Sequence, residues 1–243
     1  MRITDKLANR NADPFGAAPV SIVCLGDSVT HGCFNSMLDR HGRIDTDYIA
    51  SLSYVRKLEN QLYKLYPVAA ANVINAGIGG DNATGALKRF DRDVTRYSPD
   101  VVVVNFALND CMDPDTAGAL KRYVASMKAL FEKTTAIGAE CILLTPNMLC
   151  AYIDSSLKEE VLRGIAAAAA ERQNAGVLDR FVDAARETAQ SMEVPIADAY
   201  ASWQKYTQNG VDTTQLLANH INHPLPDMHD IFANRIVEVI MGR

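Results

Sequence analysis

Four short groups of residues along the chain carry side chains suited to acyl-transfer chemistry. In chain order they are Gly26-Asp27-Ser28, Gly79-Gly80-Asp81, Asn109-Asp110 and His223-Pro224. A serine hydroxyl attacks a carbonyl carbon when a nearby base removes its proton and fixed hydrogen-bond donors stabilise the oxyanion that forms. The four groups contain one candidate for each of these parts. Together they predict hydrolysis through a serine nucleophile.

Each group, taken alone, also has an ordinary structural explanation. Gly-Asp-Ser is common in turns and helix caps, and Asn-Asp after a strand is common turn chemistry. A glycine at position 80 would let the backbone approach a substrate oxygen, and the neutral amide of Asn109 would donate a hydrogen bond without adding charge. His223, followed by Pro224, could equally be a surface residue of a polar loop. The case for a site depends on all four groups being present in order.

The four groups resemble the conserved blocks of the SGNH, or GDSL-type, hydrolase family, and the resemblance extends over residues 20–233. The matching segments are Gly-Asp-Ser-Val-Thr at 26–30, Asn-Ala-Gly-Ile-Gly-Gly-Asp at 75–81, Ala-Leu-Asn-Asp at 107–110 and Asn-His-Pro at 222–224. The resemblance implies an esterase, lipase, thioesterase or carbohydrate acetylesterase of flavodoxin-like fold. It also implies that Ser28 is the nucleophile and His223 the general base. The implied oxyanion donors are the backbone N–H groups of Ser28 and Gly80 and the side chain of Asn109.

Two positions depart from the family's pattern. The third block usually begins with glycine, and this chain has Ala107 there, whose methyl group could narrow the pocket. The family usually has an aspartate three residues before the catalytic histidine, and this chain has His220. An imidazole cannot stabilise an imidazolium as a carboxylate does.

Three explanations for the missing aspartate stay open at this stage. His223 could act in a serine–histidine dyad, oriented by a backbone carbonyl or by His220. Another carboxylate could replace the aspartate, and the candidates are Asp212, Asp227 and Asp230, although Asp227 could also cap the last helix. Catalysis could have been lost. We expect a dyad or a substituted acid, because the other parts remain together.

Other polar residues lie close to these groups in the sequence. We expect Asp27 and His31 to contact substrate, although His31 could instead cap the turn after Ser28. The histidines and aspartates at positions 220, 223, 227, 229 and 230 match no zinc signature, and His229 belongs to the expected last helix. We therefore expect no metal and no cofactor.

The resemblance is greatest to bacterial members that remove acetyl groups from sugars, which favours a small acyl ester on a carbohydrate. Four aromatic residues in stretches that resemble loops could stack on a sugar ring, or could complete the core. They are Tyr152, Tyr200, Trp203 and Tyr206. The alternatives are a lysophospholipase or short-chain thioesterase, and a non-catalytic carbohydrate-binding relative. The polar 30–47 segment argues mildly against an apolar acyl groove.

Composition limits the remaining possibilities. The 243 residues are 48% hydrophobic with a net charge of −5, which suits one hydrolase domain over residues 1–243, with residues 1–19 as an N-terminal extension. The charge argues against nucleic-acid binding, and no apolar run approaches the ~18 residues of a membrane span. We expect a cytoplasmic protein with five reduced cysteines, a small ester as its partner, and no nucleic acid or membrane partner. Homo-oligomer formation stays open.

The elements that must position these residues alternate between strands and helices. Short apolar runs predict strands near 20–25, 72–75, 101–106, 141–144 and 194–197, and periodic patterns predict helices over 51–66, 83–97, 116–137, 156–173, from 178, and 227–241. This alternation predicts an α/β fold, a three-layer α/β/α sandwich around a central parallel sheet of about five strands. The motifs fall at strand ends, which meet at one edge of such a sheet. The irregular segments 30–47 and 207–226 are expected to wall the pocket.

Overall fold

The computed structural model describes residues 2–242, and its centre is a parallel sheet. The five strands are β1 (Ser21–Gly26), β4 (Asn72–Gly77), β5 (Val101–Asn105), β6 (Glu140–Leu144) and β7 (Ile196–Ala197). Their order across the sheet is β4-β1-β5-β6-β7, and every neighbouring pair is parallel. β5 consists of four valines followed by Asn105 and is buried throughout, as a central strand covered on both faces must be. The predicted fold class is confirmed.

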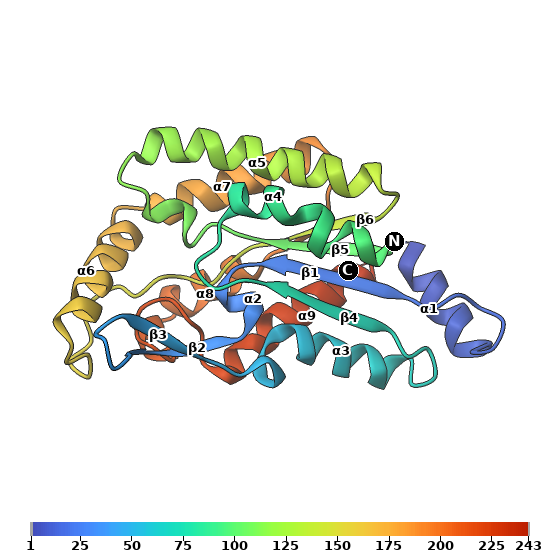
Figure 1. Ribbon diagram of the computed structural model, residues 1–243, viewed down its shortest axis with the longest axis horizontal. Helices are drawn as coiled ribbons and strands as arrows, with labels where there is room; N and C mark the ends of the chain where they lie inside the picture. Colours follow the sequence, from blue (N-terminus) through green and yellow to red (C-terminus); the bar gives the residue numbers. More distant parts are fainter. Residues whose placement is uncertain (1, 243) are drawn as a thin grey trace.

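Helices cover both faces of the sheet (Figure 1). One layer contains α4 (Ala83–Asp93), α5 (Thr116–Ala136) and α7 (Val177–Ser191), and the other contains α3 (Tyr54–Leu65) and α9 (His229–Ile240). α6 (Glu160–Asn174) precedes α7. Short 3₁₀ turns complete the chain as η1 (Ala50–Leu52), η2 (Thr95–Tyr97), η3 (Asp110–Met112), η4 (Thr213–Leu216) and η5 (Pro226–Met228). All five strands end on the same side of the molecule, where the site is assembled.

The first residues of the chain pack into the fold. Residues 2–12 form α1 (Arg2–Ala12), and its Ile3 and Leu7, one turn apart, are fully buried in the main core. The backbone N–H groups of Arg2 and Ile3 donate to the carboxylate of Glu140, at the start of β6. Helix α1 therefore closes the end of the sheet opposite to the expected site.

The segment 30–47, expected to be irregular, is largely regular. It contains the second half of the one-turn helix α2 (Ser28–His31) and nearly all of an antiparallel hairpin of β2 (Cys33–Leu38) and β3 (Ile44–Tyr48). The hairpin strands bury few side chains and contain many polar residues, so they lack the apolar alternation that predicts a strand. The hairpin lies beside the carboxyl ends of the sheet (Figure 1).

A second correction concerns helix α8 (Ala199–Gln208), which lies in a stretch that we expected to be a loop. Its Tyr200 and Trp203 are fully buried, so they complete the core and do not stack on a substrate. Tyr152 and Tyr206 are exposed. The five cysteines are free and buried. Within residues 2–242, no helix is both long and apolar enough to cross a membrane.

Candidate active site

Ser28 lies at the turn between β1 and α2. Gly26 ends the strand, and Asp27 caps the helix by accepting a hydrogen bond from the Val29 N–H at 3.0 Å. This cap places Ser28 as the first residue of α2, only 6% exposed, at the edge of the sheet. Asp27, expected to contact substrate, is fully buried, so its carboxylate supports the turn instead.

His223 is oriented by two hydrogen bonds. Its Nε2 lies 3.0 Å from the Ser28 hydroxyl oxygen, and its Nδ1 lies 3.0 Å from the backbone carbonyl oxygen of Phe34 on β2. A carbonyl only accepts, so Nδ1 must carry the proton, and Nε2 is left free to accept the proton of Ser28. Burial lowers the pKa of His223 to about 4, which keeps the imidazole neutral at neutral pH. The pair has the geometry of a nucleophile and its general base.

The loop that carries His223 is held by the side chain of Asn219. Its Oδ1 accepts from the backbone N–H groups of Ile221, Asn222 and His223 at 2.9 to 3.0 Å. Its Nδ2 donates to the hydroxyl oxygen of Ser36 on β2 at 3.1 Å. One asparagine therefore fixes the histidine loop and attaches it to the hairpin that supplies the Phe34 carbonyl.

In the described part of the chain, the residues considered as replacements for the missing aspartate form no hydrogen bond or ion pair with the His223 ring. His220 lies in a left-handed conformation with φ of 52°, and its backbone N–H donates to the Leu217 carbonyl at 3.1 Å. Asp212 accepts from the Tyr152 hydroxyl at 2.5 Å and from the Thr214 N–H. Of the open explanations, the geometry matches a dyad oriented by a backbone carbonyl.

Two further residues complete the set of alternatives. Asp227 is exposed in η5, and Asp230 forms an ion pair with Lys57 at 2.9 Å. Asp227 also does not cap the last helix, since α9 begins after Met228 and has no side-chain cap.

The expected oxyanion donors lie at the ends of β4 and β5. Gly80 has φ of 77°, a left-handed conformation that favours glycine. Asn109 donates one N–H of its amide to the Asp81 carbonyl at 2.7 Å, which leaves the second N–H of that amide for a substrate oxygen. The same hydrogen bond fixes Asn109 relative to the loop that contains Gly80.

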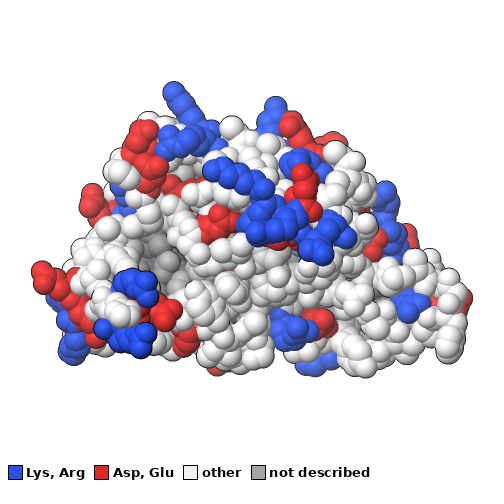
Figure 2. All heavy atoms as spheres, viewed as in Figure 1, with Lys and Arg blue, Asp and Glu red and all other residues white. Residues whose placement is uncertain are grey.

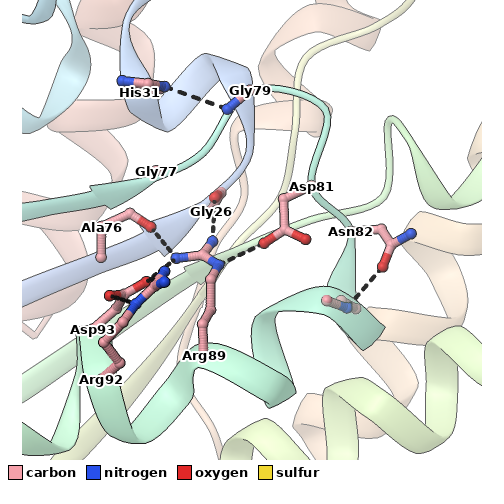
Figure 3. A network of polar contacts seen from close by, with 12 residues as sticks. Gly26, His31, Ala76, Gly77, Gly79, Asp81, Asn82, Arg89, Arg92 and Asp93 are labelled. Carbon is pink, nitrogen blue, oxygen red and sulfur yellow. Dashed lines mark hydrogen bonds and ion pairs between the residues drawn. The ribbon is translucent and has the colours of Figure 1, made fainter.

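That loop is tied to the sheet by the buried guanidinium of Arg89 on α4 (Figure 3). Arg89 donates to the carbonyls of Gly26 and Ala76, the ends of β1 and β4, at 2.9 and 2.7 Å. It also pairs with the Asp81 carboxylate at 2.6 Å and with Asp93 at 3.0 Å. One side chain thus joins the strand that precedes the serine to the loop that contains Gly80.

His31, expected to contact substrate, links two neighbouring segments. Its Nδ1 accepts a hydrogen bond from the Gly79 N–H at 3.3 Å (Figure 3). Its ring packs against Tyr48 on β3, with centroids 4.6 Å apart. Both side chains retain exposure, so they form part of the wall of the site between the hairpin and the glycine loop. In Figure 2 the surface is hollowed on the side toward which the strands run.

Ala107 is fully buried and has φ of 153°, a conformation that L-residues rarely adopt. This backbone conformation costs conformational energy for a residue that has a Cβ atom. Because Ala107 has no exposed surface, its methyl group does not narrow the pocket. Among residues 2–242, no group of three or more His, Cys, Asp or Glu side chains is arranged to hold a metal ion.

Three residues that support the site were not found from the sequence, namely Phe34, Arg89 and Asn219. The carbonyl of Phe34 carries no side-chain signal, and Arg89 resembled a solvated charge on a helix. Asn219 had one usable signal, because an asparagine in a polar loop often accepts hydrogen bonds from the next few backbone N–H groups.

A parallel α/β sheet with a serine and a histidine in hydrogen-bond contact at its carboxyl edge defines a class, the serine hydrolases. Residues 24–231 match the GDSL-like Lipase/Acylhydrolase family, and the chain belongs to that family.

Individual relatives agree with this assignment. An acetylxylan esterase from Geobacillus stearothermophilus is 25% identical over 149 residues, 58% of this chain and 64% of that protein, so the match spans less than two thirds of the relative. A variant of an acetyl-xylooligosaccharide esterase from Geobacillus matches 92% of this chain and 95% of that structure, with a TM-score of 0.66 and 20% identity. A lipase/acylhydrolase from Enterococcus faecalis matches 92% of this chain and 96% of that structure, with a TM-score of 0.66 and 23% identity. The structural likeness shows the fold.

Proposed function

We propose that Ser28 and His223 form a catalytic dyad that hydrolyses a small acyl ester, an acetyl group on a carbohydrate. The observation that carries the proposal is the pair of hydrogen bonds that places His223 Nε2 on the Ser28 hydroxyl and His223 Nδ1 on the Phe34 carbonyl. This arrangement fixes both the position of the base and the tautomer that can accept a proton.

The reaction follows from these contacts. Ser28 Oγ attacks the ester carbonyl while His223 Nε2 takes its proton, and the oxyanion accepts from the N–H groups of Ser28, Gly80 and Asn109. The imidazolium then protonates the leaving alcohol, which gives an acyl-enzyme. Water, deprotonated by His223, attacks the acyl-enzyme and releases the acid, and the proton returns to Ser28.

Two features support an acetylated sugar as the substrate. A relative with this activity in its name is the acetylxylan esterase from Geobacillus stearothermophilus. The wall formed by the β2–β3 hairpin carries many polar side chains and one half-exposed aromatic ring, Tyr48, beside His31. Polar groups beside an aromatic face suit a sugar ring, whereas a long acyl chain needs an apolar groove.

The test of the dyad is hydrolysis of p-nitrophenyl acetate by the wild type, Ser28→Ala and His223→Ala. Each substitution should lower kcat by more than about 10³-fold with the fold intact by circular dichroism, because each removes one of the two groups that move the proton. Ser155→Ala, a change to an exposed serine outside the site, is the matched control and should retain full activity. Turnover by Ser28→Ala within tenfold of the wild type would overturn the dyad.

The substrate is tested separately. A series of p-nitrophenyl esters of increasing acyl length should show the highest kcat/KM for acetate. Acetylated xylo-oligosaccharides should release acetate with a higher kcat/KM than p-nitrophenyl acetate gives. A preference for long acyl chains would reject the acetyl ester and favour a lysophospholipase or thioesterase.

A further inference from the structure

A carboxylate lies one peptide group away from the catalytic histidine. Asp47 on β3 accepts hydrogen bonds from the backbone N–H of Phe34 at 3.0 Å and of Asn35 at 2.8 Å, and from Asn35 Nδ2 at 2.7 Å. Three donors therefore hold the Asp47 side chain, which is half-buried in the hairpin. None of these contacts involves a basic side chain, so they leave its negative charge in place.

The peptide group between Phe34 and Asn35 makes hydrogen bonds at both of its ends. Its carbonyl oxygen accepts the Nδ1 proton of His223, and its N–H donates to Asp47 Oδ1. A hydrogen bond at one end of a peptide polarises the other end, so an anion at the N–H makes the carbonyl oxygen a stronger acceptor. Two hydrogen bonds, one at each end of this peptide group, therefore connect the His223 ring to the Asp47 carboxylate.

We propose that Asp47 is the positioning residue that takes over, through the Phe34–Asn35 peptide, the task of the aspartate missing at position 220. This inference rests on the proposed dyad. In this arrangement the carboxylate stabilises the imidazolium that forms when Ser28 loses its proton, and it holds the hairpin in the geometry that orients the ring. Sequence motifs do not reveal Asp47, because it lies on a hairpin strand far from the histidine block.

The electrostatics around His223 agree with this role. Burial lowers the pKa of His223, while the Phe34 carbonyl and the charge of Asp47 act in the opposite direction. His229 on α9 also faces His223, but burial lowers its own pKa to about 3, so it is neutral above that pH. The charge of Lys57 on α3 also lowers the pKa of His229. In the described part of the chain, Asp47 is the carboxylate whose charge acts on the base.

The decisive variant is Asp47→Asn. The amide oxygen can still accept from the two backbone N–H groups, and the exposed Asn35 amide can turn its oxygen toward the new NH₂ group. The hairpin therefore keeps its shape while the charge is lost. The plateau value of kcat/KM should fall about 3- to 10-fold, because the imidazolium loses a stabilising charge at a distance screened by solvent. The acid limb of the pH profile should move to lower pH, because the His223 pKa falls when the nearby anion is removed.

Two further variants separate charge from structure. Asp45→Asn removes an equal charge from an exposed position of the same strand, two residues away, and should leave both the plateau and the acid limb unchanged. Asp47→Glu keeps the charge and should keep the acid limb at its wild-type pH. A lower plateau in Asp47→Asn with no shift of the limb would mean a merely structural role and would overturn the proposal. The same shift in Asp45→Asn would also overturn it.

A second readout does not depend on turnover. Histidine side-chain NMR of ¹⁵N-labelled protein measures the His223 pKa directly, with the resonance assigned by its loss in His223→Ala. The pKa should fall in Asp47→Asn and stay unchanged in Asp45→Asn. If the wild type hydrolyses no ester, the dyad proposal fails, but this titration still decides whether Asp47 acts on His223. An unchanged His223 pKa in Asp47→Asn would overturn the inference even in an active enzyme.

Discussion

Two opposite electrostatic requirements meet at His223. As a base it must be neutral before the reaction, and burial, which lowers its pKa to about 4, keeps it so down to acidic pH. During the reaction it becomes an imidazolium in the same buried place, and that charge needs a partner. The Phe34 carbonyl supplies a dipole, and Asp47 lies behind it. The pair of contacts satisfies the second requirement without a carboxylate directly on the ring.

Single residues also differ in how far the sequence reveals them. Ser28, Gly80, Asn109 and His223 could be proposed from their types and order, because nucleophile, donors and base have distinctive chemistry. The hydrogen-bond partner of His223 Nδ1 could not be proposed from the sequence, because every residue has a backbone carbonyl. Only the folded hairpin places the Phe34 carbonyl beside the ring. The carboxylates nearest in sequence were therefore the wrong candidates.

Ala107 offers a prediction at the residue scale. Its φ of 153° is unfavourable for an L-residue, and glycine adopts that conformation freely. Ala107→Gly should raise the free energy of unfolding by about 1 kcal/mol, because the strain relieved exceeds the entropy that glycine gains in the unfolded chain. Urea denaturation monitored by circular dichroism measures this change.

The control for Ala107 is Ala86→Gly in the interior of α4. Here the backbone is helical, so glycine should lower the free energy of unfolding by about 1 kcal/mol. Equal losses of stability in both variants would mean that the backbone conformation at position 107 imposes no strain.

Among the elements, α4 contributes the most to the alignment of the strand ends. Its Arg89 donates to the last carbonyl of β1, to the penultimate carbonyl of β4 and to the loop that contains Gly80. The positions of Ser28 and Gly80 relative to each other therefore depend on one side chain that belongs to neither segment. A helix positions the site without contributing a catalytic group.

Arg89→Met tests this dependence. The change should lower the free energy of unfolding by about 3–5 kcal/mol, because it removes the donor of the largely buried Asp81 carboxylate and one donor from each of the Gly26 and Ala76 carbonyls. It should also lower kcat of the folded fraction, since the Gly80 loop loses its attachment to β1. Urea denaturation and ester hydrolysis measure the two effects.

Arg92→Met is the matched control, because Arg92 lies on the same helix and its side chain is 64% exposed in its pair with Asp93. An exposed pair contributes under about 1 kcal/mol, so this variant should be almost as stable as the wild type. If Arg89→Met also lowers the free energy of unfolding by less than about 1 kcal/mol, the strand ends keep their alignment without the Arg89 side chain.

The elements of the sheet could be predicted because their signals are local. The β-branched run of β5 and the periodic face of α3 are visible in short windows of sequence. The β2–β3 hairpin and α8 were missed for different reasons. The hairpin strands are polar and half-exposed, and they are stabilised by contacts with the site, while α8 is short and its helical period was obscured by neighbouring turn residues.

For the molecule as a whole, buried titratable groups make opposing contributions to stability. Burial raises the pKa of Asp27 and of Asp110 to about 7, and lowers the pKa of His223 and His229 to about 4 and 3. As pH rises from about 4 to 6.5, the histidines add stability, because the unfolded chain binds more protons at these sites. The two aspartates lower the stability over the same range, because the folded chain binds more protons at the aspartates than the unfolded chain does. Above pH 6.5 the histidines are neutral in both states, so of these four groups only the aspartates still change the stability with pH.

Asp27→Asn isolates one of these contributions. Asparagine resembles the neutral aspartic acid and can still accept from the Val29 N–H, so it does not need to bind a proton on folding. Relative to the wild type, the variant should gain about 1.4 kcal/mol of stability per pH unit between pH 4 and 7. Urea denaturation at half-unit intervals of pH measures the difference.

The control for Asp27 is Asp91→Asn, whose side chain is 77% exposed. Its stability relative to the wild type should be nearly independent of pH, because an exposed carboxylate is solvated in both states. A flat difference for Asp27→Asn as well would mean that Asp27 is ionised in the folded protein at pH 5.

The contact between Ser28 and His223 joins residues 195 positions apart. A chain still being synthesised, complete as far as the end of α8, already contains all five strands, the nucleophile and the oxyanion donors, and it has no base. In the proposed dyad, activity begins only when the final segment reaches the hairpin near the start of the chain. An unfinished chain therefore carries a serine that has no base to activate it.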